Sequence, residues 1–203
     1  LWRAACTERT NPPRPCRTRF RTWTRIDMHA TIGAMTWSAP IANWNANTLP
    51  RAEDGHPGAF GVERRHHFHE GVDLYTEQGG PVFAVEAGVV VALTPFTGQA
   101  LGHTWWNDTD ALFVHGESGI VVYGELHAAD VRVGDTVRPG QLIGRVVRVL
   151  KVDKGRPMDM LHLELRAASH PDALTLFDWA KDLPRPDWLL DPTPHLLAIP
   201  SAP

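Results

Sequence analysis

The sequence predicts an all-β protein, an antiparallel β-sandwich or barrel-like sandwich with a short helix near the C-terminus. Short segments rich in Val, Ile, Leu and Phe follow one another through the chain and are separated by glycine-containing turns. No long window places apolar residues at the 3.6-residue period of an amphipathic helix. Many short strands joined by such turns are typical of sandwiches and barrels.

Each expected strand is a short apolar run that ends at a turn. The runs cover residues 69–73, 81–86, 88–93, 111–115, 119–124, 131–146 and 159–166, and glycines divide the run at 131–146 into shorter pieces. A turn at residues 87–88 and a hairpin loop at 116–119 separate neighbouring runs. The expected helix lies near residues 172–180, because Pro171 can occupy a first helical turn. The leucines of the tail, 189–197, are expected to pack on the body.

Composition and charge describe one globular domain with appendages. The 203 residues are 43% hydrophobic and 21% charged, and no stretch approaches the roughly twenty apolar residues of a membrane span. The net charge of −3 combines +6 over residues 1–26, which hold seven arginines and one acid, with −9 over residues 27–203. An acidic body argues against a nucleic-acid partner.

Three segments are expected: a basic head at 1–34, an irregular lead-in at 35–57 and the β domain at 58–203. The head contains Cys6 and Cys16, is rich in Arg, Thr and Pro, and has no apolar periodicity. It fits a disordered basic arm, an Arg-rich targeting segment, or translated sequence upstream of a true start at Met28 or Met35, which we favour. It contains no apolar stretch of the signal-peptide type.

The central motif is His69-Glu-Gly-Val-Asp73. In an extended segment, side chains two residues apart point the same way, so His69 and Asp73 share a face and Gly71 between them adds no bulk. The segment 159–166 alternates leucines with polar residues, which predicts a half-buried strand that carries His162 opposite its leucines. Imidazole nitrogen and carboxylate oxygen together suit Zn²⁺. We therefore expect a zinc site of His69, Asp73 and His162 with one position left for water.

Five blocks of sequence, together with the tail, resemble the lysostaphin-type zinc metalloendopeptidases, a family that cleaves peptide bonds in bacterial cell-wall peptidoglycan. The blocks lie at residues 69–74, 80–90, 122–126, 131–144 and 160–164, and the resemblance continues into the tail at 191–197. In that family the first His and the Asp of the motif, and the second His of a later His-x-His, bind zinc. The resemblance carries these roles to His69, Asp73 and His162, and implies an antiparallel β-sandwich with its site in a groove.

Two positions depart from the family pattern. Where the family has auxiliary histidines, this chain has Met160 and Glu125. Methionine cannot move protons, whereas a carboxylate beside a metal can act as a general base toward water. Glu125 is therefore the candidate catalytic residue, the alternative being a solvated carboxylate at a strand end. Met160 is expected to pack or to line the groove.

Several neighbouring side chains have both a functional and a structural interpretation. Trp105 and Trp106 lie in the loop 94–110 and are candidate substrate-binding residues of the groove wall, or one packs on the core. Glu164 either orients a neighbour or faces solvent. His66, His67 and His127 are expected to be surface histidines, although His127 would reach the groove if the backbone bulged.

Two functions follow from these expectations. The first is hydrolysis of peptidoglycan peptide bonds by zinc-activated water. The alternative is a catalytically degenerate, zinc-stabilised module that binds cell-wall peptides or a protein partner. The segment 131–144 also resembles biotinyl and lipoyl carrier domains, but Lys151, Lys154 and Lys181, the lysines of the body, do not lie in an acceptor hairpin. Members of the resembled family usually act outside the cytoplasm.

Overall fold

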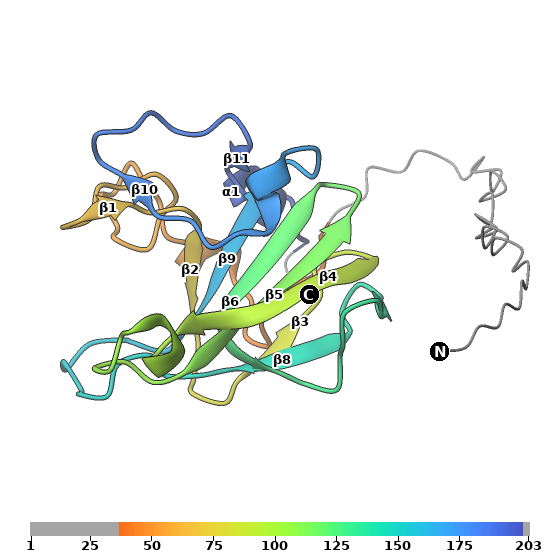
Figure 1. Cartoon of the computed structure of the whole chain (residues 1–203), viewed down its shortest axis with the longest axis horizontal. Helices are drawn as coiled ribbons and strands as arrows, with labels where there is room; N and C mark the ends of the chain where they lie inside the picture. The colour runs from red at the N-terminus through yellow and green to blue at the C-terminus, as the bar shows by residue number, and fades with distance from the viewer. Residues whose placement is uncertain (1–36, 201–203) are drawn as a thin grey trace, which may run out of the picture. The chain divides into compact units, whose positions relative to one another are not determined.

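Antiparallel strands make up most of the regular structure in the computed structural model, which describes residues 37–200 (Figure 1). The predicted basic head, residues 1–34, lies outside the described residues. The strands are β1 (His67–Phe68), β2 (Val72–Tyr75), β3 (Pro81–Phe83), β4 (Gly88–Thr97), β5 (Thr109–Gly116), β6 (Ile120–Ala128), β7 (Thr136–Val137), β8 (Leu142–Val146), β9 (Met160–Arg166), β10 (Trp179–Ala180) and β11 (Leu189–Leu190). Three 3₁₀ turns, η1 (Ala46–Thr48), η2 (Gln99–Leu101) and η3 (Pro171–Leu174), and one α-helix, α1 (Thr193–Leu197), complete them.

One large sheet carries the site. Its strands run in the order β11-β9-β6-β5-β4-β7, while β2 pairs with β9 and β8 joins β3 to β6. Every pairing is antiparallel, which confirms the prediction of an antiparallel all-β protein. The expected hairpin is formed by β5 and β6, and β1 and β10 form a separate two-stranded ribbon. Figure 1 shows β2, β9 and β6 side by side, where the site lies.

The central strands are buried on both faces. Leu112 and Val114 of β5 face the main core, whereas Ala111 and Phe113, which alternate with them, face a second, smaller cluster. Strand β6 divides its side chains in the same way. Burial on both faces explains why these strands read as continuous apolar runs rather than as an alternating pattern.

Strand β9 is more buried than the sequence predicts. Its leucines enter the main core, as expected, but His162, Glu164 and Arg166 on the other face are only 6%, 2% and 1% exposed. The prediction of a half-buried strand was therefore wrong. The polar face is covered because its side chains bond to one another and to loops packed over them, as described below.

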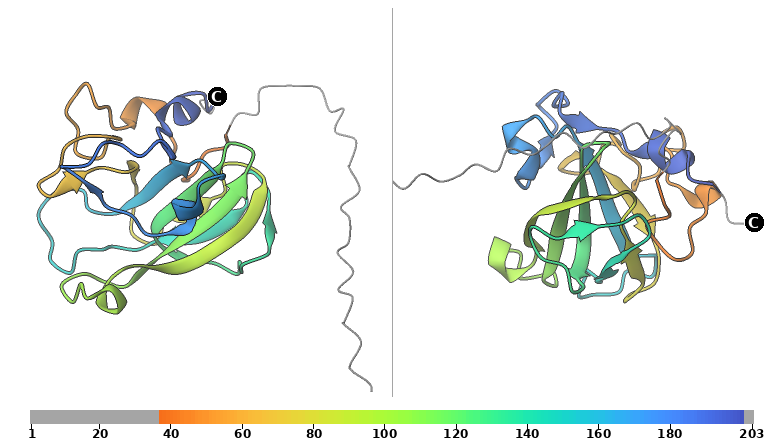
Figure 2. Two further views of the ribbon diagram at one scale, coloured as in Figure 1. Left: turned by 45° about the horizontal axis from the view of Figure 1, so that its top comes forward. Right: turned by 90° about the vertical axis from the view of Figure 1, so that its right-hand side faces the viewer.

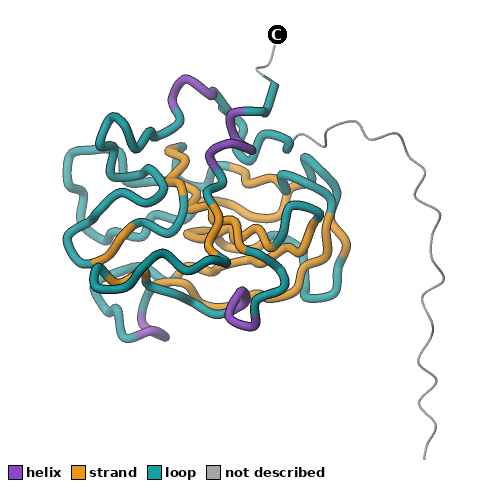
Figure 3. The backbone as a smooth tube through the Cα atoms, turned by 90° about the horizontal axis from the view of Figure 1, so that it is seen from above, coloured by secondary structure: helices purple, strands orange, loops and turns teal. Residues whose placement is uncertain are grey.

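The prediction of a helix near residues 172–180 was also wrong. Only η3 is helical there, with His170 Nδ1 accepting from the Asp172 amide, and the chain is extended again at β10. The Trp179 amide donates to the buried Glu70 carboxylate at 2.6 Å, and β10 pairs with β1. These contacts hold the segment extended. The α-helix of the described residues is α1, and Figure 3 shows that the helical turns lie at the periphery of the strands.

The lead-in and the tail pack against each other. Trp37 is buried and stacks on His195 of α1, with 4.8 Å between ring centroids. Both views in Figure 2 place α1 beside the η1 turn. In the tail, Leu189 and Leu196 are buried as expected, whereas Leu197 is exposed. Within residues 37–200, no helix is long and apolar enough to cross a membrane.

Candidate metal centre

Three side chains converge at the β2–β9 pair. His69 Nε2, Asp73 Oδ1 and His162 Nδ1 form a triangle with 3.1 Å between each pair of atoms, and all three residues are buried. A tetrahedral ion with bonds of about 2.0–2.1 Å holds its ligand atoms about 3.3 Å apart. The triangle therefore has the size and the donor chemistry that a zinc-like dication requires, and these residues are the ones the sequence predicted.

The backbone explains how residues 89 positions apart meet. Strand pairing sets Asp73 directly opposite His162. His69 precedes a bend at Gly71, so the extended segment expected at 69–73 begins only at Val72. At Gly71 a β-carbon would lie 2.5 Å from the Leu163 carbonyl oxygen. Glycine is required there because the chain passes against the backbone of β9.

Each of the three candidate ligand residues is oriented by a second contact. His69 Nδ1 donates to the Ala59 carbonyl at 2.9 Å, which leaves the Nε2 lone pair directed at the triangle. His162 Nε2 donates to Glu164 at 3.0 Å and leaves Nδ1 for the triangle. The other oxygen of Asp73 pairs with the Arg64 guanidinium. Such outer contacts fix the ring tautomers and orientations of metal-binding histidines.

The hydrogen bond from His162 to Glu164 is part of a buried network of charged side chains. The Glu164 carboxylate accepts from Arg166 at 2.7 and 2.8 Å, and Arg166 also donates to the carbonyls of Ala173 and Thr175. The Arg166 guanidinium lies over the Trp188 ring. Sequence reasoning did not assign Arg166 a role. The available signal was its position two residues beyond Glu164 on the same strand face.

Burial and charge set the protonation of the triangle. Burial lowers the pKa of His69, which is therefore a neutral imidazole at pH 7. Burial alone would also lower the pKa of His162, but hydrogen bonds to Asp73 and Glu164 outweigh it and raise the pKa to about 10. Although burial would raise the pKa of Asp73, the two histidines lower it. Without a metal, His162 is a cation between two carboxylates.

Glu125 is directed at the site by an irregular backbone. The β5–β6 register shifts between Asp110 and Leu112, and Glu125 on the facing bulge has a φ of +62°. Left-handed backbone at a non-glycine residue is uncommon and is found at functional sites. Glu125 Oε2 is buried and has no hydrogen-bond partner among the described residues. Burial, followed by the Asp73 charge, raises the pKa of Glu125 to about 8.

Two groove arms meet at the triangle. The basic arm, with a cavity volume of about 460 Å³, contains Asp73 in its wall, and the aromatic arm, of about 250 Å³, contains His162. Both arms share the side chains of Arg64, His67, Thr97, Trp106 and Glu125. The candidate metal centre and Glu125 therefore lie at the junction of the two arms.

The other candidate residues differ in whether they line the groove. Trp106 lines both arms, whereas Trp105 is 61% exposed and lines neither. Met160 lines the basic arm. His127 is exposed and lies 3.4 Å from Asp110, because the bulge directs Glu125, not His127, into the groove. His67, expected at the surface, is half-buried and belongs to the wall of both arms.

Residues 67–173 match the model of peptidase family M23. Comparison with curated proteins gives no match. Similar solved structures include a zinc-containing peptidase from Vibrio cholerae, at 20% identity over 64% of this chain and 36% of that one, with a TM-score of 0.44. The catalytic domain of the antimicrobial peptidase lysostaphin from Staphylococcus simulans has 22% identity over 68% and 86% of the two chains, with a TM-score of 0.45.

A third similar structure is Helicobacter pylori Csd3. It has 20% identity over 71% of this chain and 36% of that one, with a TM-score of 0.44. The chain thus spans about a third of the length of the Vibrio and Helicobacter proteins.

Proposed function

Because the chain belongs to peptidase family M23, we propose that it is a zinc-dependent hydrolase of peptide bonds in bacterial cell-wall peptidoglycan. The observation that carries this proposal is the triangle of His69, Asp73 and His162 at the junction of two groove arms. A bound chain crossing this junction would present a peptide bond to the site. Such a substrate implies that the protein acts outside the cytoplasm.

The donor set fits zinc. Two imidazole nitrogens and one carboxylate oxygen, with a position left open, are a common arrangement of catalytic zinc. Zinc held by these residues would act as a Lewis acid on the peptide carbonyl and would lower the pKa of a water molecule. The protein would supply rigidity, since Ala59 and Glu164 hold the two rings and Arg64 holds the carboxylate.

Glu125 is the proposed general base. Its unpaired Oε2 is buried in the wall common to both arms, where the proton of an attacking water can be accepted. A dication held by the triangle would favour the carboxylate over the acid and so would lower the pKa of Glu125 from about 8. A base whose pKa lies near the working pH is efficient, and this assistance is typically worth about 10²–10⁴-fold in rate.

Met160 supports a second candidate function. This residue lines the basic arm where the resembled family has a histidine, and its thioether cannot donate or accept a proton in catalysis. Without that imidazole, the same groove would serve as a zinc-stabilised module that binds cell-wall peptides or a protein partner. Binding without turnover is the property that distinguishes this module from the hydrolase.

The test is release of soluble fragments from purified peptidoglycan, and hydrolysis of oligoglycine peptides, by the zinc-loaded protein, with zinc content measured on the same samples. Glu125→Gln is expected to lower the rate by about 10²–10⁴-fold while zinc content is unchanged. Glu117→Gln, at an exposed hairpin position, is the matched control. Equal activity of Glu125→Gln and wild type would remove Glu125 from the mechanism. Retention on peptidoglycan without fragment release would favour the binding module.

A further inference from the structure

The two groove arms differ in charge. Four cations, Arg64, Arg65, Lys154 and Arg156, line the basic arm against the three acids Glu63, Asp73 and Glu125. Two of these acids are already engaged, because Glu63 pairs with Lys181 at 2.6 Å and Asp73 pairs with Arg64. The aromatic arm has Arg64 as its single arginine or lysine, against four acids, Glu70, Glu125, Glu164 and Asp178. The basic arm is thus a positive surface on a body whose net charge is −9 over residues 27–203.

Three cations of the basic arm are free to bind a ligand. Arg65, Lys154 and Arg156 are exposed, and within residues 37–200 their side chains make no ion pair or hydrogen bond. Single exposed cations are ordinary on a protein surface. These three come from two segments far apart in sequence and border the same groove, so their positive potential is focused there.

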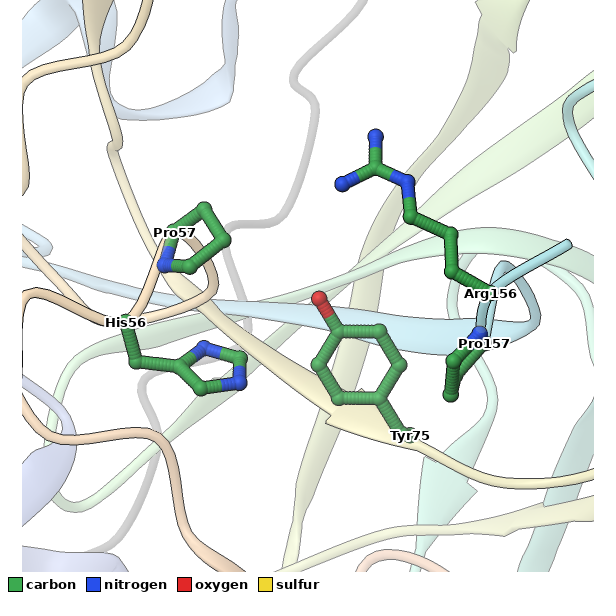
Figure 4. A pocket seen from close by; sticks show the side chains of 5 residues that line it. All are labelled: His56, Pro57, Tyr75, Arg156 and Pro157. Atoms are coloured by element: carbon green, nitrogen blue, oxygen red, sulfur yellow. The ribbon is translucent and has the colours of Figure 1, made fainter. Parts of the chain in front are cut away.

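A small pocket adjoins this arm and shares four lining residues with it, Pro57, Tyr75, Arg156 and Pro157. Its walls are His56, Pro57, Tyr75, Arg156 and Pro157, and none of the described acidic side chains lines it. Figure 4 shows the Tyr75 hydroxyl and the Arg156 guanidinium directed toward the same space. His56 Nδ1 accepts from the Gly58 amide at 3.0 Å, so in the neutral ring the proton is on Nε2. The pocket therefore combines a phenol, a guanidinium and an imidazole N–H, all hydrogen-bond donors.

The strand geometry sets the distance from this pocket to the candidate metal centre. Asp73 and Tyr75 are two residues apart on β2 and point to the same face, about 7 Å from each other along the strand. An extended peptide advances about 3.3 Å per residue. A peptide bond at the metal centre would therefore place the pocket about two or three residues away along the bound chain.

We propose that this pocket, with Arg65 and Lys154 along its approach, binds a free carboxylate of the substrate and selects peptides that carry an acidic group two or three residues from the cleaved bond. The inference rests on the proposed function for the position of that bond. The ligand chemistry is independent of it, because Arg and neutral donors converging without a competing acid suit a carboxylate. Uncharged oligoglycine would leave the Arg156 guanidinium without an anionic partner in this pocket.

The test uses the zinc-loaded full chain and capped hexaglycine peptides with one Glu placed at each position in turn, each paired with its Gln counterpart. Calorimetry gives the affinity and mass spectrometry gives the hydrolysis of the same samples. At one or two adjacent positions Glu is expected to be preferred over Gln about ten-fold, in kcat/KM for cleaved peptides or in Kd for intact ones. Arg156→Gln is expected to abolish the preference and Tyr75→Phe to reduce it.

Arg138→Gln, an exposed cation outside the groove walls, is the matched control and is expected to keep the preference. Equal treatment of Glu and Gln at every position, no binding of any Glu peptide at millimolar concentration, or a preference that persists in Arg156→Gln would overturn the carboxylate assignment. A Glu preference in binding without hydrolysis of any peptide would overturn the hydrolase proposal and leave this assignment intact.

Discussion

Glu164 accepts a hydrogen bond from His162 Nε2 at 3.0 Å, and this contact turns the other ring nitrogen of His162 toward Asp73 and His69. The same carboxylate binds Arg166, so one buried acid both orients a candidate metal ligand and neutralises a buried cation. The candidate metal centre is therefore held in place by its own three residues and also by the buried Glu164–Arg166 pair, which lies on the same face of β9 as His162.

Glu164→Gln is expected to weaken zinc binding by about 10–100-fold, because the orienting carboxylate of a metal-binding histidine is removed while its volume is kept. The variant also leaves the buried Arg166 without its anion, which is expected to cost about 3 kcal/mol of unfolding free energy. Competition with a chelator measures the first effect and urea unfolding the second. Glu117→Gln is the control. Unchanged zinc affinity would show that Glu164 does not orient His162.

Removal of zinc is expected to destabilise the wild-type protein but not Asp73→Asn. A ligand present at 100 times its Kd adds about 2.7 kcal/mol to the free energy of unfolding, and only a chain that binds zinc can lose this contribution. Thermal unfolding with zinc and with EDTA checks the expectation, and Asp187→Asn, at an exposed position, should respond as the wild type does. An EDTA effect of equal size in Asp73→Asn would exclude Asp73 as a ligand.

Met160→His is expected to raise peptide hydrolysis at least ten-fold if the hydrolase proposal is right. The substitution returns an imidazole to the wall of the basic arm, where it can donate or accept a proton, and proton transfer of this kind typically contributes about 10²–10⁴-fold. The kcat of zinc-loaded wild type, Met160→His and Met160→Leu is compared on one peptide. The Leu variant, which keeps an apolar side chain, should match the wild type. A gain in Met160→Leu as well would point to packing instead of proton transfer.

The metal-free protein is expected to lose stability relative to Glu125→Gln as the pH rises from 5 to 8. Burial raises the pKa of Glu125 to about 8 in the folded protein. Below the ordinary carboxyl pKa the side chain is protonated in both the folded and the unfolded state, so the ionisation of Glu125 takes nothing from stability there. Between that value and about 8, only the unfolded chain ionises, so stability falls. Urea unfolding in EDTA should show that the difference in unfolding free energy between wild type and Glu125→Gln changes by an amount on the order of 1–3 kcal/mol between pH 5 and 8. Parallel pH profiles for the two proteins would mean that the carboxyl is solvated.

Part of the fold and of the candidate site follows from local sequence pattern. The antiparallel class was predictable because apolar runs, turn glycines and the β5–β6 hairpin are local signals. The short helix was misplaced because a distant contact decided it, namely the carboxylate of Glu70 on the Trp179 amide. Local preference for a helical turn at Pro171 could not reveal that bond.

By itself, the sequence determined the strand-forming pattern and the residue types, two histidines and one aspartate, that suit a dication, since both are encoded locally. Only the tertiary structure decided the rest: the bulge that directs Glu125 inward, the Glu164–Arg166 chain, and the separation of Trp106 from Trp105. It also decided the convergence of Arg65 and Arg156 on one arm. The physical reason is that burial and charge at a site depend on segments far apart along the chain, whose proximity exists only after the strands have paired.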